Sequence, residues 1–581
     1  MQSHNSINDR NVSVSVSGAG GSGAVTAGLI LLKSMANAGY YGYMTRFSGP
    51  QIRGGESAVV LNFSDAPAER SARSSDIHFA LDWHGFERFS DEIPLNSQSC
   101  VIFDNSHDAL PDSVASTGAK IIEVNLKDQA DQLKGSRPNA FAVGIVASQL
   151  GLPLNAVLEA LEQVMEKKGG EIFRTASEAV GRGYRLLERD AAPLENWKPV
   201  SHTRWNISGN EACALGALRA GVKFAAAYPI TPASDIVEYL APRLEKYGGN
   251  VMIAEDELAA MNMVIGGSFG GKPSMTATSG PGFSLMIEAM GLAIASEVPA
   301  LVINVMRGGP STGLPTKSEQ TDLNQVLFGM HGEAPHVVVA PLSIGDCVVT
   351  TQWAVGLAEH LQTLVVLVSD QRLGQSRAII DAVPSQTFDL KRKILPEQDG
   401  KGSYLRYAVT PDFISPMAIP GNAAGRYTAD GLEHTVSGKP SSMASDHLQQ
   451  LKKREAKVTQ FDYGRMWAET CFQQESAEIV VLTWGSVYHN TKEAVSELYH
   501  EGSPVALLGL RLLMPLQTEA IQAFCEGKKV IVVEQSYSGQ LYHYLQGQGA
   551  IDASALTLAK PGPLVLGSDE IKAFIKEAAN D

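Results

Sequence analysis

The amino-acid sequence predicts an α/β protein with three α/β domains. Two observations lead to this fold class. Short apolar runs of strand length, such as residues 299–306 (PALVINVM), alternate with helix-like stretches in three separate parts of the chain, which is typical of parallel sheets covered by helices. The chain also has 581 residues, more than one domain usually contains, and polar, proline-containing segments interrupt the alternation.

The first domain is predicted to span residues 1–190. It opens with the alternating strand NVSVSVS, followed by a glycine-rich turn, SGAGGSG, that leads into a helix. Further strand-like runs between helical stretches lie at residues 57–63, 77–81, 101–104 and 120–124. This βαβ pattern predicts a doubly wound sheet. Residues 191–206 are polar and contain prolines, and we interpret them as a linker.

The alternation resumes twice after the linker. Residues 207–375 hold the strand-like runs FAAAYPI, PSMTATS and ALVINVM between helices and form the second predicted domain. Residues 376–455 are rich in Gly, Pro, Ser and His, but aromatic residues recur in them, so we expect a long connecting segment packed over other domains. Residues 456–581 contain AEIVVLTWGS, SPVALLGLRLL and KKVIVVEQSYSGQL and form the third α/β domain.

Charge and composition exclude several classes of partner. The net charge is −15 with no basic stripe, so we expect no nucleic acid, because phosphate contacts need clustered Lys and Arg. The apolar runs are far shorter than a membrane span, and because the start, MQSHNSINDR, is polar, we expect no signal peptide. The 5 cysteines are scattered without a CxxC pair, which favours reduced thiols in the cytoplasm.

The first candidate site is the turn Gly18-Ala-Gly-Gly-Ser-Gly23. It follows a strand and opens a helix, as a dinucleotide-binding loop does. Such a loop is normally accompanied by an acidic residue at the end of the second strand, yet that strand reads YYGYMTRF, with Arg46 rather than an acid. We therefore expect a tight turn with a structural or interface role, and keep NADP binding as an alternative.

The second candidate site is Tyr228-Pro-Ile-Thr-Pro-Ala-Ser-Asp235. Two prolines bracket Thr231 and hold it extended at the end of a predicted strand, where ligands bind in open α/β sheets. The structural alternative is a helix start, with Thr231 as the capping residue and Pro232 in the first helical position.

Three acids and a glycine-rich turn follow. Glu255, Asp256 and Glu257 open an apolar helix, where acids commonly complement the helix dipole. Glu257 leads directly into the apolar LAAMNMVIGG, so its carboxylate is a candidate for partial burial and proton sharing. The segment TATSGPG, residues 276–282, is either an anion-binding turn or a plain tight turn.

Residues 307–316, RGGPSTGLPT, follow the apolar strand ALVINVM. Arg307 carries a planar, permanently charged fork that suits a carboxylate, and the adjacent glycines allow close backbone approach. Ser311 and Thr312 add hydroxyl donors. The alternative is a structural Arg307 paired with a nearby acid.

Taken together, these motifs resemble a known family. YPITPASD, EDELAAMN, TATSGPGFSLMIEA, RGGPSTGLPTKSEQTDL, GLEH and VVEQSYSGQL occur in this order. The chain resembles, over nearly its whole length, the α subunit of 2-oxoacid:ferredoxin oxidoreductases in which a γ domain is fused to the N-terminus. GAGGSG, SGPQIRGGES and NAFAVGIVASQLGL are similar to the γ domain. Ser536 and Leu432 stand where the family often has Asn.

The resemblance implies a fold for each region and a chemistry. Residues 207–375 would be the pyrimidine-binding domain of a thiamine enzyme, and residues 456–581 a transketolase C-terminal-like domain. Glu257 would bind N1′ of thiamine diphosphate, and Arg307, Thr231, Ser311 and Thr312 would bind the substrate. Further cofactor contacts would come from Pro229, Ile230, Ser279 and Gly280, and no metal ligand is assigned.

The resemblance also implies partners. A β subunit would hold Mg²⁺, the cofactor diphosphate and a 4Fe–4S cluster in an α2β2 heterotetramer, since this chain has neither a GDG motif nor clustered cysteines. The expected reaction is coenzyme A-dependent oxidative decarboxylation of a 2-oxoacid with ferredoxin, or the reverse, CO2 fixation; the fused γ domain favours 2-oxoglutarate. Two other classes stay open: a thiamine-dependent dehydrogenase or transketolase subunit without ferredoxin, and an NADP-binding regulatory subunit.

Overall fold

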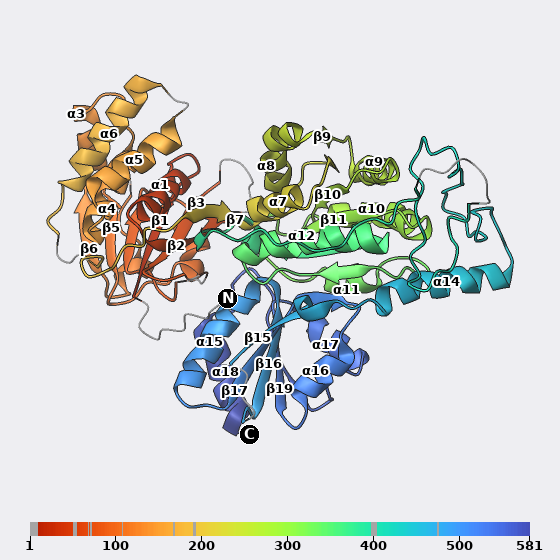
Figure 1. Ribbon diagram of the computed structural model, residues 1–581. Coiled ribbons are helices and arrows are strands. Elements are labelled where there is room, and N and C mark those ends of the chain that lie inside the picture. The colour runs from red at the N-terminus through yellow and green to blue at the C-terminus, as the bar shows by residue number, and fades with distance from the viewer. Residues whose placement is uncertain are drawn as a thin grey trace. The chain divides into compact units, whose positions relative to one another are not determined.

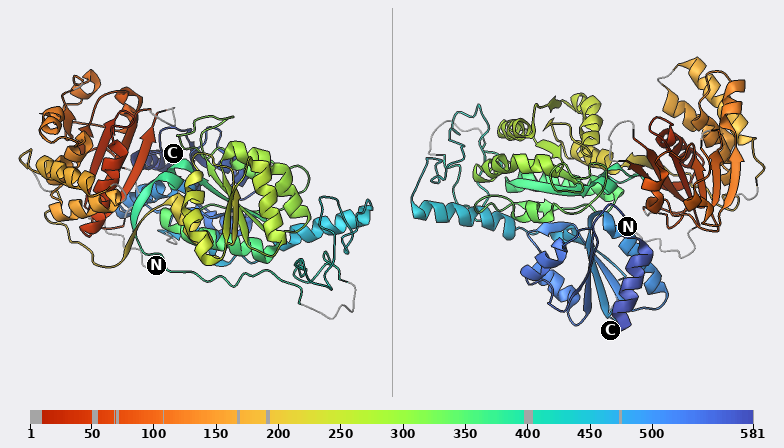
Figure 2. Two further views of the ribbon diagram at one scale, coloured as in Figure 1. Left: turned by 90° about the horizontal axis from the view of Figure 1, so that it is seen from above. Right: turned by 180° about the vertical axis from the view of Figure 1, so that it is seen from behind.

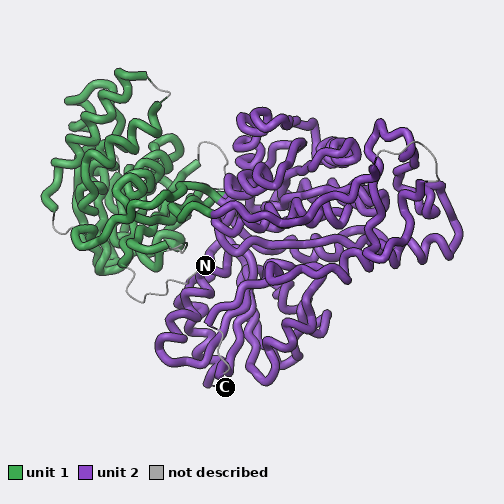
Figure 3. The backbone as a smooth tube through the Cα atoms, viewed as in Figure 1, with its two compact units in different colours: residues 1–208, 375–383 green, residues 209–374, 384–581 purple. Residues whose placement is uncertain are grey.

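The computed structural model describes residues 10–49, 55–67, 69, 72–106, 108–166, 169–189, 193–396, 404–472 and 476–580. Part of the SGPQIRGGES motif, residues 50–54, lies outside the described residues. The chain divides into two compact units (Figure 3), residues 1–208 with 375–383, and residues 209–374 with 384–581. Every candidate site residue from Pro229 to Thr312 belongs to the second unit.

In the described part of the first unit, eight strands form one sheet in the order β6-β5-β4-β1-β3-β2-β14-β7 (Figure 1). The strands are β1 (Asn11–Gly18), β2 (Tyr41–Ser48), β3 (Ser57–Ser64), β4 (Ile77–Ala80), β5 (Cys100–Asp104), β6 (Lys120–Val124), β7 (Arg204–Ser208) and β14 (Arg377–Asp381). The helices are α1 (Ala24–Asn37), α2 (Asp112–Ala115), α3 (Leu126–Gln132), α4 (Pro138–Leu150), α5 (Leu154–Met165) and α6 (Gly170–Tyr184).

This sheet is half parallel and half antiparallel. β1, β4, β5 and β6 pair in parallel, as the βαβ pattern predicts. β3, β2, β14 and β7 continue the sheet in antiparallel pairs, an arrangement that the sequence pattern did not predict. β7 and β14 come from segments that we interpreted as the linker and the connecting segment, and they join this unit because Arg377 to Asp381 pair with Ser208 to Arg204.

The second unit contains two sheets. The first has the order β18-β12-β13-β11-β10-β8-β9, and its pairs are parallel except that between β12 and β18. Its strands are β8 (Phe224–Ala227), β9 (Asn250–Ile253), β10 (Ser274–Thr278), β11 (Ala300–Met306), β12 (Val337–Val339), β13 (Leu364–Asp370) and β18 (Leu512–Met514). Its helices are α7 (Gly209–Arg219), α8 (Ser234–Leu244), α9 (Glu257–Phe269), α10 (Gly280–Ala295), α11 (Leu323–Phe328), α12 (Ile344–Leu361) and α13 (Gln371–Gln375).

The second sheet of this unit has the order β15-β17-β16-β19-β20. Its strands are β15 (Ala468–Cys471), β16 (Ile479–Trp484), β17 (Val505–Leu510), β19 (Lys529–Glu534) and β20 (Leu556–Ala559). Its helices are α15 (Tyr488–His500), α16 (Thr518–Cys525), α17 (Gln540–Gly547) and α18 (Ser568–Asn580). One apolar core, which includes Val302 of β11 and Leu482 of β16, continues from one sheet to the other.

The connecting segment packs through buried polar groups. It ends in α14 (Ala444–Thr459), which lies beside the irregular chain that precedes it (Figure 2). Lys453 and Lys457 of α14 are fully buried, and their Nζ atoms lie 2.5 and 3.0 Å from the two carboxylate oxygens of Glu297, just after α10. The guanidinium of Arg406 donates to the backbone oxygen of Glu297 at 2.7 Å. Buried ion pairs therefore help to pack α14 against the rest of the unit, whereas most surface helices pack through an apolar face.

Among the described helices, none is both long enough and apolar enough to cross a membrane.

Candidate functional site

The candidate residues follow the carboxyl ends of β8, β9, β10 and β11, where parallel sheets bind their ligands. After β8, Pro229 and Ile230 form a turn in which the amide of Ala233 donates to the oxygen of Ile230 at 2.8 Å. The Thr231–Pro232 peptide is cis. α8 begins only at Ser234, with Ala233 in the cap position, so Thr231 does not cap this helix as our structural alternative expected.

Arg307 and Thr231 meet at this edge of the sheet. Nη1 of Arg307 donates to the backbone oxygen of Thr231 at 2.7 Å. The Arg307 side chain is 6% exposed, and burial lowers its pKa while the charge of Asp322 opposes that shift. Its Nε atom is buried and has no partner among the described residues. One edge of a buried guanidinium is thus available for an anion.

The three consecutive acids have different surroundings. Asp256 caps α9 by accepting from the amide of Ala259 at 2.7 Å, while Glu255 is exposed. Glu257 is only 5% exposed, and its carboxylate lies against the start of α10, because a Cβ at Gly282 would stand 2.5 Å from its Oε1 atom. In the described part of the chain, no group donates a hydrogen bond to this carboxylate. Helix capping therefore accounts for Asp256 and not for Glu257.

The turn between β10 and α10 presents a second unpartnered group. Ser279 is extended and fully buried, and its hydroxyl neither caps α10 nor finds a partner among the described residues. Gly280 follows it as the first residue of the helix. A Cβ at Gly280 would lie 2.8 Å from Oδ2 of Asp322, so this glycine makes room for a carboxylate.

Asp322 and Asn304 belong to the site although we assigned them no role from the sequence. Nδ2 of Asn304 donates to Oδ2 of Asp322 at 3.1 Å. Burial raises the pKa of Asp322, against the opposing effects of Asn304 and Arg307. The sequence did contain a signal for Asn304. It is a polar residue inside the apolar run ALVINVM, which becomes the fully buried strand β11, and a buried polar residue usually has a specific role.

Ser311 and Thr312 lie exposed, in contrast to the buried side chains of Glu257, Ser279 and Arg307. A bridge between Gly308 and Leu314 closes the segment 308–317 into a narrow loop, and the amide of Leu314 donates to the oxygen of Gly308 at 2.7 Å. Ser311, with φ of 60°, and Thr312 lie exposed at its tip. In the described residues, neither hydroxyl hydrogen-bonds to Arg307. A substrate role for these two residues stays a prediction.

In the first unit, the glycine-rich turn is already engaged. The amide of Ala19 donates to both carboxylate oxygens of Asp82 at 2.9 Å, and a Cβ at Gly23 would lie 2.3 Å from the side chain of Asn139. The side chain of Asp82 therefore takes the place where a dinucleotide phosphate would accept from the turn.

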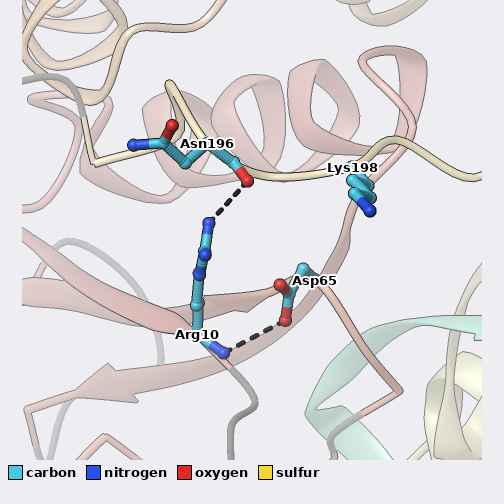
Figure 4. Close-up of a pocket in the computed structure, with 4 residues that line it drawn as sticks. All are labelled: Arg10, Asp65, Asn196 and Lys198. Atoms are coloured by element: carbon cyan, nitrogen blue, oxygen red, sulfur yellow. Dashed lines mark hydrogen bonds between the residues drawn. The ribbon is translucent and has the colours of Figure 1, made fainter.

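A cavity of about 510 Å³ in the first unit is lined by Arg10, Asp65, Asn196 and Lys198 (Figure 4). Nη1 of Arg10 donates to the oxygen of Asn196 at 2.5 Å, and the amide of Arg10 donates to Asp65 at 3.1 Å. None of the residues predicted for the site lines this cavity.

Comparison with known proteins identifies the family. Residues 215–453 match the thiamine diphosphate-binding family of pyruvate flavodoxin/ferredoxin oxidoreductases. Residues 13–186 match pyruvate ferredoxin/flavodoxin oxidoreductase, and residues 477–552 match core domain II of pyruvate:ferredoxin oxidoreductase. The 2-oxoacid:ferredoxin oxidoreductase α subunit of a Sulfolobus species is 31% identical over 90% of this chain and 90% of the relative. This chain belongs to that family of α subunits.

Other relatives of this α subunit agree with the assignment. The 2-oxoglutarate synthase subunit KorA of Archaeoglobus fulgidus is 36% identical over 58% of this chain and 88% of the relative. The solved 2-oxoglutarate:ferredoxin oxidoreductase of Magnetococcus marinus, with 2-oxoglutarate, coenzyme A and succinyl-CoA bound, is 32% identical, with a TM-score of 0.88 over 98% of this chain and 99% of that chain. The α/β fold class and the oxidoreductase class predicted from the sequence are confirmed.

Proposed function

We propose that this α subunit catalyses, together with a β subunit, the coenzyme A-dependent oxidative decarboxylation of 2-oxoglutarate, with ferredoxin as the electron acceptor. The membership of the oxidoreductase family supports the reaction class. The preference for 2-oxoglutarate is supported by the ligands of the Magnetococcus marinus structure and by the KorA relatives. Ferredoxin as acceptor is supported by the names of the same relatives.

The observation that carries the proposal is the environment of Arg307. Its guanidinium is buried, one nitrogen is held by the Thr231 oxygen, and Nε is left without a partner among the described residues. A buried cation with a free hydrogen-bonding edge is costly unless a ligand completes it. We assign that ligand as the 1-carboxylate of the oxoacid, which would accept from Nε and the adjacent Nη2 as a two-point contact.

Glu257 and the β10–α10 turn fit the aminopyrimidine end of thiamine diphosphate. Among the described residues, the carboxylate of Glu257 has no donor and the Ser279 hydroxyl has no partner, and Gly280 and Gly282 leave space where side chains would intrude. When bound, thiamine diphosphate supplies the electron sink that decarboxylation of a 2-oxoacid requires. Glu257 would hold a proton shared with N1′, and Pro229 and Ile230 would border the ring.

We further propose that Mg²⁺, the diphosphate-binding domain and a 4Fe–4S cluster belong to the β subunit of an α2β2 enzyme. The naming of the relatives as α subunits supports an enzyme of several subunits. The cytoplasm is the proposed location, since the scattered free cysteines fit a reducing compartment.

The test is an anaerobic assay of this chain co-expressed with the product of the neighbouring gene. Ferredoxin reduction is measured with coenzyme A and either 2-oxoglutarate, pyruvate or a branched 2-oxoacid, and NAD and NADP are offered as alternative acceptors. We expect the highest kcat/KM with 2-oxoglutarate and reduction of ferredoxin alone. Reduction of NAD without ferredoxin would support the dehydrogenase alternative. Binding of NADP by the chain alone would support the regulatory alternative, which Asp82 on the glycine turn disfavours.

A further inference from the structure

The first turn of α10 lies between two carboxylates. Gly282 faces Glu257, since a Cβ there would lie 2.5 Å from its Oε1, and Gly280 faces Asp322, where the corresponding distances are 2.8 and 2.9 Å to the two oxygens. The proposed cofactor interaction uses only Glu257. The carboxylate of half-buried Asp322 has no part in the chemistry assigned above.

The side chain of Asp322 does not cap α11, the helix that it precedes. The carboxylate instead accepts from Asn304, which is fully buried on β11 three residues before Arg307. Aspartate commonly caps the helix that it precedes, but the carboxylate of Asp322 lies instead toward the end of β11, the strand that Arg307 follows.

Asp322 and Arg307 act on each other electrostatically without forming an ion pair. Each shifts the pKa of the other toward the charged form, against the effect of burial on both. The direct hydrogen bond of the guanidinium goes to the neutral oxygen of Thr231. Any anion that binds the free Nε edge must therefore share the guanidinium with a second negative charge already in place.

We propose that Asp322 acts through space on the 1-carboxylate of the bound oxoacid, weakening its ground-state binding at Arg307 and favouring its departure as CO2; this inference rests on the proposed function of Arg307 as the carboxylate clamp. In the step concerned, the C1–C2 bond of the oxoacid breaks, its electron pair stays on the C2 side, and the carboxylate leaves as a neutral molecule. The repulsion by Asp322 is present before the step and absent after it, so it lowers the barrier.

The variant that tests this is Asp322→Asn, which keeps the shape of the side chain and can still accept from Asn304. With repulsion between unit charges several ångströms apart in a partly solvated site, we expect the oxoacid to bind on the order of threefold to tenfold more tightly and CO2 release to slow by a similar factor. Binding of 2-oxoglutarate is measured calorimetrically on the complex freed of cofactor, and release of labelled CO2 in a single turnover of the complete enzyme.

Glu319→Gln is the matched control. Glu319 lies three residues earlier, loses the same charge on substitution, and influences Asp322 but is not among the groups that shift the pKa of Arg307. Its substitution should leave both quantities within about twofold of wild type. Thermal melting of each variant shows whether the fold is retained.

Arg307→Lys separates this inference from the proposed function. If the lysine variant binds 2-oxoglutarate as tightly as wild type, the clamp itself is misassigned. If the lysine variant binds more weakly, the clamp stands and Asp322→Asn decides the inference. Tighter binding together with slower CO2 release supports the role of Asp322. Unchanged or weaker binding, or tighter binding with an unchanged rate of release, overturns it.

Discussion

Substitution of Glu297 by Gln should destabilise the second unit strongly. The Glu297 carboxylate is fully buried and faces two fully buried lysines, Lys453 at 2.5 Å and Lys457 at 3.0 Å. Burial alone would raise the pKa of Glu297, but the two ammonium groups and Arg406 bring it below its usual range. Glutamine keeps the volume and removes the negative charge that faces these three cations.

The magnitude follows from the number of cations left without a partner. Removing one member of a buried ion pair costs about 3–5 kcal/mol, because the desolvation of the remaining charge is no longer compensated. In a cooperative unit of this size, that loss lowers the apparent melting temperature by roughly 4–10 °C. The measurement is differential scanning of wild type and variant, prepared in the same way with any subunit that co-purifies.

Lys457→Met is the matched control, since it removes a cation that is in excess. Burial lowers the pKa of Lys457 to about 7, so its charge is poorly stabilised in the fold. When Lys457 is replaced by Met, the Glu297 carboxylate still faces Lys453 and Arg406, so no buried charge is left without an opposite one, and we expect a smaller loss of stability than from Glu297→Gln. A loss from Lys457→Met as large as that from Glu297→Gln would refute the reasoning.

The same cluster sets a direction for the pH dependence. An unfolded lysine keeps its proton up to about its ordinary pKa of 10.5, whereas Lys457 in the folded protein, with a pKa of about 7, loses its proton above that pH. Between these values the unfolded state binds more protons, so the stability of the wild type should rise with pH relative to Lys457→Met. Melting of both proteins at pH 7 and pH 9 checks the sign. A melting temperature of the wild type that falls relative to that of the variant between these two pH values would contradict it.

Three further outcomes concern the site. Glu257→Gln should still bind thiamine diphosphate while exchange of the cofactor C2 proton slows by about 10²–10⁴-fold, as for other acid–base groups, and an unchanged rate would leave Glu257 without this role. Arg307→Lys should lower kcat/KM for the oxoacid by about one to two decades, mainly through KM, with coenzyme A affinity retained; the reverse pattern in steady-state kinetics would move Arg307 to the thiol substrate. The chain purified alone should show neither turnover of oxoacid nor iron–sulfur absorbance, so a brown, active single chain would contradict the division of the site between subunits.

Much of the architecture was predictable because it depends on local patterns. The apolar run ALVINVM became β11, buried at all seven positions, and the alternating NVSVSVS became β1. The antiparallel half of the first sheet was not predictable in this way. β7 and β14 are short and lie far apart in the sequence, and their pairing depends on neighbours that neither segment specifies by itself.

The site was predictable to the extent that it follows the ends of strands. The proximity of Arg307 and Thr231 follows from the parallel order of β8, β10 and β11, which brings their carboxyl ends to one edge. Ser311 and Thr312 were grouped with Arg307 by closeness in sequence, but the bridge that closes their loop carries them to an exposed tip. The role of Asp322 depends on where a side chain points, which no spacing rule encodes.

Two groups of buried polar residues in the second unit differ in whether their polar atoms have hydrogen-bond partners. Each oxygen of Glu297 meets a lysine ammonium, and each lysine has a further acceptor, the Ser415 hydroxyl for Lys453 and the Gln362 oxygen for Lys457. At the other end of α10, Ser279 Oγ, Asn304 Oδ1 and Arg307 Nε are buried without a partner in the described part of the chain. Unpaired polar atoms cost free energy in the folded chain, so their gathering at one edge of a sheet is best explained by a ligand that completes them. The Glu297 carboxylate needs no ligand of this kind, because each of its oxygens already pairs with a lysine within the fold.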